Sequence, residues 1–338
     1  MKIIDIENHF TTPRLLEIMG TRTETPRFDP VKGLGYFEDA WCPIGDLGMK
    51  DHLLDVDEGR IALLDNAGID FVQLSLQSPG AEPFEVEVSK EVAEDVNNYI
   101  AAAIKKHPTR LGAFMTLAPK DPDWSLNEID RCLDMGLWGW HTHSNFGDAY
   151  LDERRFWPIL KKCEALDMPI YIHPAVTAAK DLRTFGICLA APSFGFTVDT
   201  IWCFMRMIHR GVFDEFPNLK IILGHYGEGL PFFYDRVNAA YRQGFGMPDP
   251  EIGTYKNEPG YYIGKNLWAT SSGNFLPQAL YLTKDVMGID KVMVATDHPY
   301  EDVPKGIDMI RKDDKLSEEE KTAFLGGNAQ ALGFGKNI

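Results

Sequence analysis

Four segments of the chain end in side chains that could bind a metal ion. Each follows a short apolar run, and the side chains are Glu7 and His9, then His173, His225 and Asp297. Imidazoles and carboxylates without a thiolate suit one divalent ion that keeps open positions for substrate, and both zinc and manganese fit such a set. Any one of these residues alone could be a hydrogen-bonded core residue. Their recurrence at four strand ends favours a metal centre.

The residues after His225 indicate an acid/base pair. The chain continues Tyr-Gly-Glu-Gly, and the glycines allow a tight turn that keeps Glu228 close to His225. The alternative is a helix start at which a glutamate favours the positive end of the helix dipole. Arg236 follows on the same helix, where it could hold a carboxylate or phenolate by paired hydrogen bonds or join a salt bridge.

A second histidine pair, His141 and His143, competes for the metal. Their spacing of two places both side chains on one face of a strand. They could bind the ion, line a wall for an aromatic substrate, or pack beneath loops. His298 follows Asp297 directly and, by strand alternation, should point away from it, which argues against His298 as a ligand.

These residues need a scaffold that brings distant segments together. Eight β-branched or aromatic runs, each followed by a segment of helical periodicity such as 85–106, indicate repeated βα units. The expected strands are 2–9, 71–76, 111–117, 137–143, 169–173, 220–225, 266–271 and 291–297. This pattern predicts an α/β fold, a (β/α)8 TIM barrel, whose active site lies at the C-terminal ends of the strands.

Residues 1–338 are expected to form one domain. Two stretches do not fit the repeat, 20–48 and 249–265, and we interpret them as loop insertions that cover the site. Within the first stretch, aromatic residues including Trp41 could sandwich a substrate ring or pack at an interface.

Composition narrows the class of partner. At 338 residues and 44% hydrophobic, the chain can bury a large core, and its formal charge of −16 opposes binding to nucleic acid or anionic membranes. Neither a secretory signal nor a stretch near 20 apolar residues is evident, so a cytoplasmic protein without membrane contact is expected.

Five cysteines without C-x-x-C spacing argue against disulfides and thiolate zinc sites. No phosphate or dinucleotide motif follows a strand, so no organic cofactor is expected.

Four motifs together resemble a known family. They are Glu-Asn-His-Phe at 7–10, Tyr-Ile-His-Pro at 171–174, Leu-Gly-His-Tyr-Gly-Glu-Gly-Leu-Pro at 223–231 and Ala-Thr-Asp-His-Pro-Tyr-Glu at 295–301. They resemble the amidohydrolase-2 family, most closely its γ-resorcylate, 2,3-dihydroxybenzoate and 5-carboxyvanillate decarboxylases, over nearly the whole chain. Hydrolytic relatives typically begin with H-x-H, whereas these decarboxylases carry E-x-H or E-x-A, and this chain has Glu7-x-His9.

The resemblance implies roles for the candidate residues. Glu7, His9, His173 and Asp297 would bind one divalent ion, Zn²⁺ or Mn²⁺, and His225 with Glu228 would form a supporting acid/base dyad. Arg236 falls where a family arginine holds substrate, and we add His141, His143 and Trp41 as expected substrate contacts. No arginine in 42–50 matches the lid arginine that some relatives use. A homodimer or homotetramer is also implied.

The implied reaction is nonoxidative decarboxylation of an ortho-hydroxybenzoate-like acid. Carboxylate and hydroxyl chelate the ion, the ring carbon is protonated, and CO2 leaves. Asp297 is the first candidate for proton donor, which demands a raised pKa, and His225 is the second. Two alternatives stay open: hydrolysis of a lactone or carbon–carbon bond on the same scaffold, and a non-catalytic binding barrel.

Overall fold

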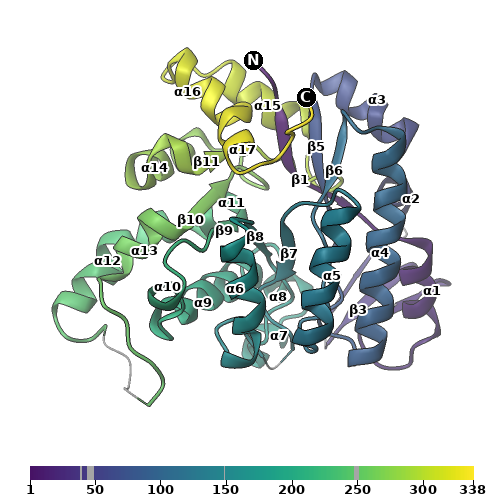
Figure 1. Cartoon of the computed structure of the whole chain (residues 1–338), viewed down its shortest axis with the longest axis horizontal. Helices are drawn as coiled ribbons and strands as arrows, with labels where there is room; N and C mark the ends of the chain where they lie inside the picture. The colour runs from purple at the N-terminus through teal and green to yellow at the C-terminus, as the bar shows by residue number, and fades with distance from the viewer. Residues whose placement is uncertain (39, 44–48, 148, 247–250) are drawn as a thin grey trace.

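Eight parallel strands form the centre of the molecule in a computed structural model that describes residues 1–38, 40–43, 49–147, 149–246 and 251–338 (Figure 1). The strands are β1 (Ile4–Phe10), β5 (Phe71–Leu76), β6 (Leu111–Ala113), β7 (Trp140–His143), β8 (Ile170–His173), β9 (Ile221–Leu223), β10 (Leu267–Thr270) and β11 (Val292–Met293). All eight coincide with predicted strands, although most are shorter.

Backbone contacts close these strands into a barrel. Hydrogen-bonded ladders join β1-β5-β6 and β7-β8-β9-β10-β11. A bridge between Met115 and Trp140 links β6 to β7. On the other side, the His9 amide donates to the His298 carbonyl at 2.7 Å and the Asp297 amide to the Glu7 carbonyl at 2.9 Å. The predicted (β/α)8 barrel is therefore confirmed.

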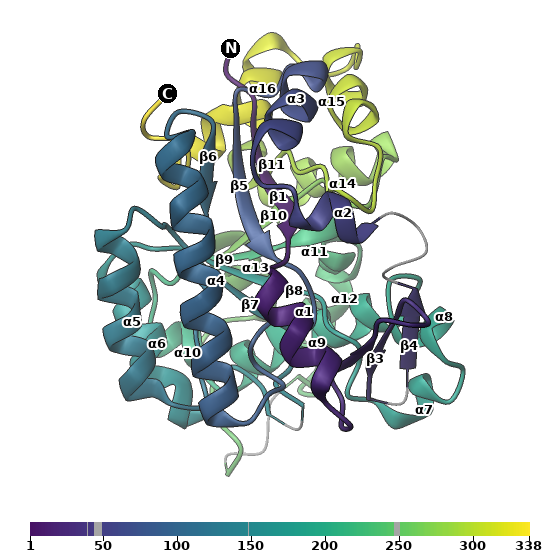
Figure 2. The same ribbon diagram turned by 90° about the vertical axis from the view of Figure 1, so that its right-hand side faces the viewer.

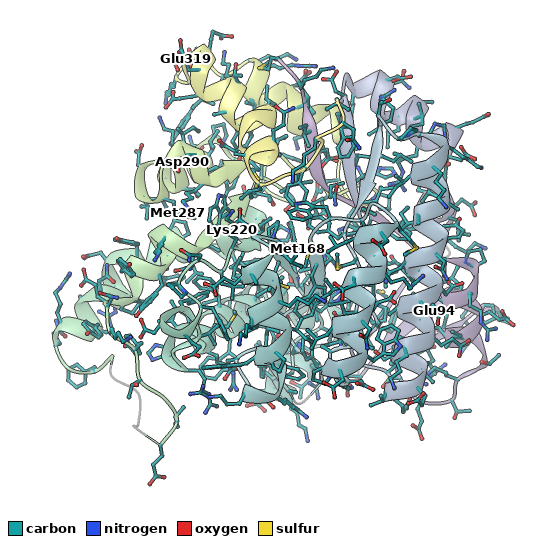
Figure 3. All side chains as sticks on the ribbon, viewed as in Figure 1. Glu94, Met168, Lys220, Met287, Asp290 and Glu319 are labelled. Atoms are coloured by element: carbon teal, nitrogen blue, oxygen red, sulfur yellow. The ribbon has the colours of Figure 1, made fainter. Side chains whose placement is uncertain are left out.

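Helices cover the outside of the barrel (Figure 2). In α4 (Val86–Lys106), Val92, Val96 and Ile100 are buried at four-residue intervals, while Glu94 faces outward (Figure 3). The other helices are α1 (Pro13–Thr21), α2 (Met49–Leu54), α3 (Glu58–Ala67), α5 (Pro122–Asp134), η1 (Arg154–Phe156), α6 (Trp157–Ala165), α7 (Lys180–Arg183), α8 (Ile187–Ala190), α9 (Gly195–His209), α10 (Val212–Glu215), α11 (Gly224–Glu228), α12 (Leu230–Arg242), α13 (Pro259–Asn266), α14 (Pro277–Met287), η2 (Ile289–Lys291), α15 (Val303–Arg311), α16 (Glu318–Thr322), η3 (Ala323–Gly327) and α17 (Asn328–Ala331).

Both stretches predicted as loops contain regular structure. Within 20–48, β2 (Arg27–Asp29), β3 (Leu34–Phe37) and β4 (Ala40–Pro43) pair as an antiparallel sheet, which packs against α8 (Figure 2). The Arg27 guanidinium stacks at 3.7 Å over the ring of Tyr36, its cross-strand partner, and this contact supports the pairing. Within 249–265, α13 begins with a proline in its first turn. Residues 39, 44–48, 249 and 250 of these stretches lie outside the described residues.

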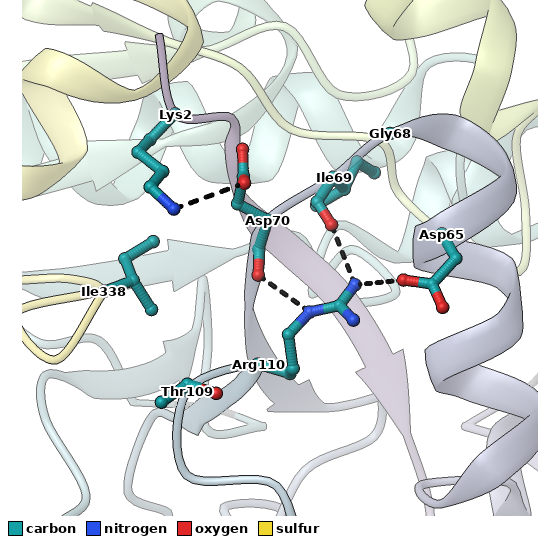
Figure 4. Close-up of a pocket in the computed structure, with 8 residues that line it drawn as sticks. All are labelled: Lys2, Asp65, Gly68, Ile69, Asp70, Thr109, Arg110 and Ile338. Carbon is teal, nitrogen blue, oxygen red and sulfur yellow. Dashed lines mark hydrogen bonds and ion pairs between the residues drawn. The ribbon is translucent and has the colours of Figure 1, made fainter.

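The N-terminal end of the barrel carries a pocket, at the opposite end from the strand ends that hold the polar candidates. This pocket of about 560 Å³ lies beside the starts of β1, β5 and β6 (Figure 4). Arg110 pairs there with Asp65 at 2.7 Å, and Lys2 pairs with Asp70 at 3.5 Å. Its charged side chains thus satisfy one another, as expected at the stabilising end of a barrel.

One apolar segment, Ile187–His209, is long enough by length and composition to cross a membrane, with a mean hydropathy of 1.4. The expectation that no stretch approaches this length was therefore wrong. In the structure the segment comprises α8, a turn and α9. Cys203, Phe204 and Met207 of α9 are buried in the core, whereas Phe194 and Trp202 in the same segment are about half exposed.

Candidate metal centre and active site

The four residues predicted to bind a metal ion lie together at the C-terminal end of the barrel. Glu7 and His9 come from β1, His173 ends β8, and Asp297 follows β11. One ligand atom from each lies within 4.8 Å of the others, and all four residues are buried. The His9 Nε2 atom is 3.1 Å from Asp297 Oδ1, and His173 Nε2 is 3.5 Å from Glu7 Oε1. The group has the nitrogen and oxygen donors of a divalent-metal site.

A bulge in β1 sets the direction of Glu7. The pairing of β1 with β5 shifts register between Asp5 and Asn8. The Asp5 carboxylate accepts from the Glu7 amide at 3.2 Å, and from the Thr296 amide at 3.0 Å. Bulges beside active sites redirect side chains, and Asp5 here ties the bulge to the segment that carries Asp297.

The two carboxylate oxygens of Glu7 differ in their hydrogen bonding. The Tyr171 hydroxyl donates to Glu7 Oε2, and the Thr270 hydroxyl approaches the same oxygen at 3.3 Å. Glu7 Oε1 is buried without a hydrogen-bond partner among the described residues. Burial, and next the Asp297 carboxylate, raises the pKa of Glu7. A divalent cation between the two carboxylates would remove that repulsion, so the residues fit the ion.

Hydrogen bonds select the ring nitrogens that face the site. The His173 Nδ1 atom donates to the Pro174 carbonyl at 2.7 Å, because a carbonyl oxygen can only accept. Its Nε2 lone pair is then directed toward Glu7. Burial, and next the neighbouring His9, holds the pKa of His173 well below its usual value. His9 Nδ1 lies 3.1 Å from the Ser75 hydroxyl, which positions the second imidazole.

His225 and Glu228 form a close pair in a left-handed turn. The His225 Nδ1 atom lies 2.6 Å from Glu228 Oε1. His225, Tyr226 and Glu228 have φ values of 53°, 55° and 56°, a region that costs L-residues about 1–2 kcal/mol each. Such strain is typical of functional sites. Burial lowers the pKa of His225, but Glu228 and Asp297 outweigh it and raise the pKa well above its usual value.

Asp297 does not show the raised pKa that direct proton donation demands. Burial raises the pKa of Asp297, yet the nearby imidazoles of His225 and His9 lower it well below its usual range. The Nε2 atom of His225 lies 3.9 Å from Asp297 Oδ2. The two pKa directions favour an ionised Asp297 carboxylate beside a protonated His225 imidazole.

The remaining candidates lie in different places. His141 and His143 are buried in the barrel beside His173, with ring centroids 5.3 and 5.5 Å from it. They stand outside the four-residue group, as does His298. Arg236 is exposed on α12 and makes no hydrogen bond or ion pair with another described residue, and Trp41 on β4 is 52% exposed.

Sequence reasoning missed the residues that support the ligands. Tyr171 and Ser75 contact Glu7 and His9, and the Arg60 guanidinium donates to the His9 carbonyl at 3.0 Å and to Asn8. Tyr171 had a usable signal, because it precedes His173 by two residues and therefore faces the same interior. Arg60 had none, because it lies on α3, an ordinary outer helix.

A closed (β/α)8 barrel with a buried Glu-His-His-Asp group at its mouth defines a barrel enzyme with a divalent-metal centre. The chain belongs to the Amidohydrolase family, whose model matches residues 4–332.

Individual relatives match the chain over almost its full length. It is 31% identical to γ-resorcylate decarboxylase of Polaromonas sp., with 97% of both chains covered. Its structure resembles 5-carboxyvanillate decarboxylase of Sphingomonas paucimobilis, with TM-score 0.86, 28% identity and 98% of each chain covered. It also resembles the Novosphingobium aromaticivorans enzyme of the same name, complexed with manganese and 4-hydroxy-3-methoxy-5-nitrobenzoic acid. That match has TM-score 0.85 and 30% identity, and covers 98% of this chain and 95% of the other.

Proposed function

We propose that this chain is a metal-dependent, nonoxidative decarboxylase of an aromatic acid that carries a hydroxyl group ortho to its carboxylate. The observation that carries the proposal is the buried group of Glu7, His9, His173 and Asp297 beside the His225–Glu228 pair. The full-length similarity to decarboxylases of hydroxylated benzoates supports it. The cation is Zn²⁺ or Mn²⁺, and manganese is the ion present in the Novosphingobium relative.

The four candidate metal ligands create a site that suits an anionic aromatic ring. Glu7, His9, His173 and Asp297 would hold the ion, which supplies positive charge to orient the substrate oxygens and to withdraw electron density from the ring. The buried position of all four residues excludes water and strengthens these electrostatic interactions. The chain's own acid/base groups then have to deliver one proton to the ring carbon.

We assign that proton to His225 in the resting enzyme. The Glu228 carboxylate faces His225 Nδ1 at 2.6 Å and favours the charged imidazolium, while His225 Nε2 lies 3.9 Å from Asp297 Oδ2. Asp297 receives the proton and passes it to the carbon that bears the carboxylate. The bond between that carbon and the carboxyl carbon then breaks and CO2 leaves. The electron pair of the broken bond restores the aromatic ring.

The test is a product assay on metal-replete protein. The panel is salicylate, 2,3-dihydroxybenzoate, 2,6-dihydroxybenzoate and 5-carboxyvanillate, and the expected products are the phenol and CO2. Asp297→Asn should keep the fold and lose turnover. Absence of CO2 from the whole panel would contradict the proposal. Hydrolysis of a lactone would instead support the alternative function on this scaffold.

We also propose that residues 1–338 act as one domain, in the cytoplasm, within a homodimer or homotetramer. The exposed aromatic side chains Phe232 and Phe233 on α12 and Trp202 on α9 support a buried contact between copies. Arg236 also lies on α12, and both Arg236 and Trp41 are exposed on the single chain. We therefore assign their contacts with the substrate to the assembled enzyme. Light scattering after size exclusion tests the assembly, and a monomer at micromolar concentration would contradict it.

A further inference from the structure

Thr197 on α9 contacts the His225–Glu228 pair from outside the barrel strands. Its hydroxyl donates to Glu228 Oε2 at 2.8 Å, while His225 Nδ1 lies 2.6 Å from the other oxygen, Glu228 Oε1. The Glu228 side chain is 1% exposed. Both oxygens of this buried carboxylate are therefore engaged, one by the imidazole and one by the threonine.

A carboxylate that is held at one oxygen only is free to turn. The last torsion of a glutamate side chain has a broad energy minimum, so the contact with His225 alone does not fix the plane of the Glu228 carboxylate. A second hydrogen bond, to the opposite oxygen, fixes that plane. Thr197 supplies this bond, and the β-branched side chain of threonine is itself stiff.

The start of α9 is tied to the mouth of the barrel. Asp199 Oδ2 accepts from the Ser144 hydroxyl and from the Asn145 side-chain amide, each at 2.6 Å. Asp199 Oδ1 accepts from the Thr177 hydroxyl at 3.2 Å. These partners follow β7 and β8, so the helix turn that carries Thr197 is held against the same strand ends that carry the site.

The hydroxyl of Thr197 is used differently from those of other helical threonines. Thr200, also on α9, and Thr283 on α14 both donate at 2.8 Å to the carbonyl four residues earlier in their own helix. This local bond is the usual one for threonine in a helix. Thr197 donates instead to a side chain 31 positions away, on α11.

We propose that Thr197 is a positioning residue for proton delivery, and that its hydroxyl holds the Glu228 carboxylate in the orientation that faces His225. Thr197 acts through Glu228 and not on the substrate. The inference deepens the proposed decarboxylase function and rests on it, because the pair needs a fixed geometry only if it moves a proton.

The kinetic test removes the hydroxyl and keeps the shape of the side chain. In Thr197→Val we expect kcat on the best acid of the panel to fall about 10–100-fold, with KM unchanged and one manganese per chain. Thr197→Ser restores the hydroxyl and should recover most of the lost turnover. Thr200→Val is the matched control, because Thr200 is buried on the same helix and donates only within it.

A double variant separates positioning from a general packing role. In the Glu228→Gln background, Thr197→Val should cause little further loss of kcat, because the charged group that Thr197 orients is already gone. Independent effects would instead multiply.

Four kinetic results would overturn the inference. They are wild-type kcat in Thr197→Val, an equal loss in Thr197→Ser and Thr197→Val, an equal loss in the Thr200→Val control, and losses that multiply in full in the double variant. Each would show that the hydroxyl does not act through Glu228.

A crystal structure separates this inference from the proposed function. In zinc-loaded Thr197→Val we expect the Glu228 carboxylate to turn, so that its contact with His225 Nδ1 is broken or divided between two conformers. That result supports the role of Thr197 even if no acid is decarboxylated. A carboxylate that keeps its wild-type orientation in the variant overturns the inference, as does a zinc-loaded wild type without the contact between Thr197 and Glu228.

Discussion

Tyr171 donates its phenolic hydrogen to Glu7 Oε2, which leaves Glu7 Oε1 as the free oxygen that lies 3.5 Å from His173 Nε2. The tyrosine thereby orients a ligand without contacting the ion position itself. Supporting hydrogen bonds of this kind typically change metal affinity by 10–100-fold. Much of the affinity of this centre should therefore reside in residues outside the ligand set.

Replacement of Tyr171 should weaken metal binding without unfolding the protein. Tyr171→Phe removes the donor to Glu7 and should raise the manganese dissociation constant by about tenfold or more. Competition with a fluorescent chelator measures this constant. Tyr99→Phe is the control, because Tyr99 donates instead to the Leu54 carbonyl, away from the ligands. Equal affinity in wild type and Tyr171→Phe would show that Glu7 needs no such support.

Metal removal should lower thermal stability. Glu7 and Asp297 are both buried, and the two carboxylates repel one another without a cation. Manganese at 100 times its dissociation constant should stabilise the folded state by about 2.7 kcal/mol. Thermal melts before and after chelation, and after manganese is restored, measure the change. Asp297→Asn should lose most of this increment, and an identical Tm with and without manganese would contradict the site.

The His225–Glu228 pair should affect turnover far more than metal content. Glu228→Gln keeps the size of the side chain but removes the charge that stabilises the His225 imidazolium. We expect kcat to fall by about 10²–10⁴-fold, the usual contribution of acid/base catalysis. Elemental analysis should still give one metal per chain. Wild-type turnover in this variant would exclude the pair from proton delivery.

Gly273 should be essential for the placement of His225. A Cβ atom at position 273 would lie 2.6 Å from His225 Cδ2, and the φ of Gly273 is +59°. Gly273→Ala therefore combines backbone strain with a displaced imidazole, and activity should fall by an order of magnitude or more, about 1.4 kcal/mol in the barrier. Gly244→Ala is the matched control, since its φ is +82° and its Cβ meets nothing within 4 Å. Comparable activity of the two variants would contradict this placement.

The sequence indicated the barrel and the ligand set because both depend on local patterns. The four ligands lie in or shortly after the buried strands β1, β8 and β11, and barrel geometry brings the ends of such strands together. The support residues depend on long-range contacts that a local pattern does not contain. Tyr171 and Glu7 are 164 positions apart, and Thr197 and Glu228 are 31 positions apart.

The segments outside the repeat were the least predictable. The sheet at 27–43 arises from cross-strand pairs such as Arg27 and Tyr36, and glycine-rich composition concealed it. Arg236 and Trp41 are exposed on the single chain, and their expected substrate contacts stay predictions. Loops and assembly decide such contacts, and neither follows from strand periodicity.

The central claim is that one divalent ion, held by Glu7, His9, His173 and Asp297, makes this chain a decarboxylase. Titration of metal-free protein with manganese, with CO2 release from the hydroxybenzoate panel as the readout, tests it most directly. The account predicts no turnover without metal and a linear rise that ends at one manganese per chain. Full turnover in the metal-free protein, or none at any manganese concentration, would contradict it.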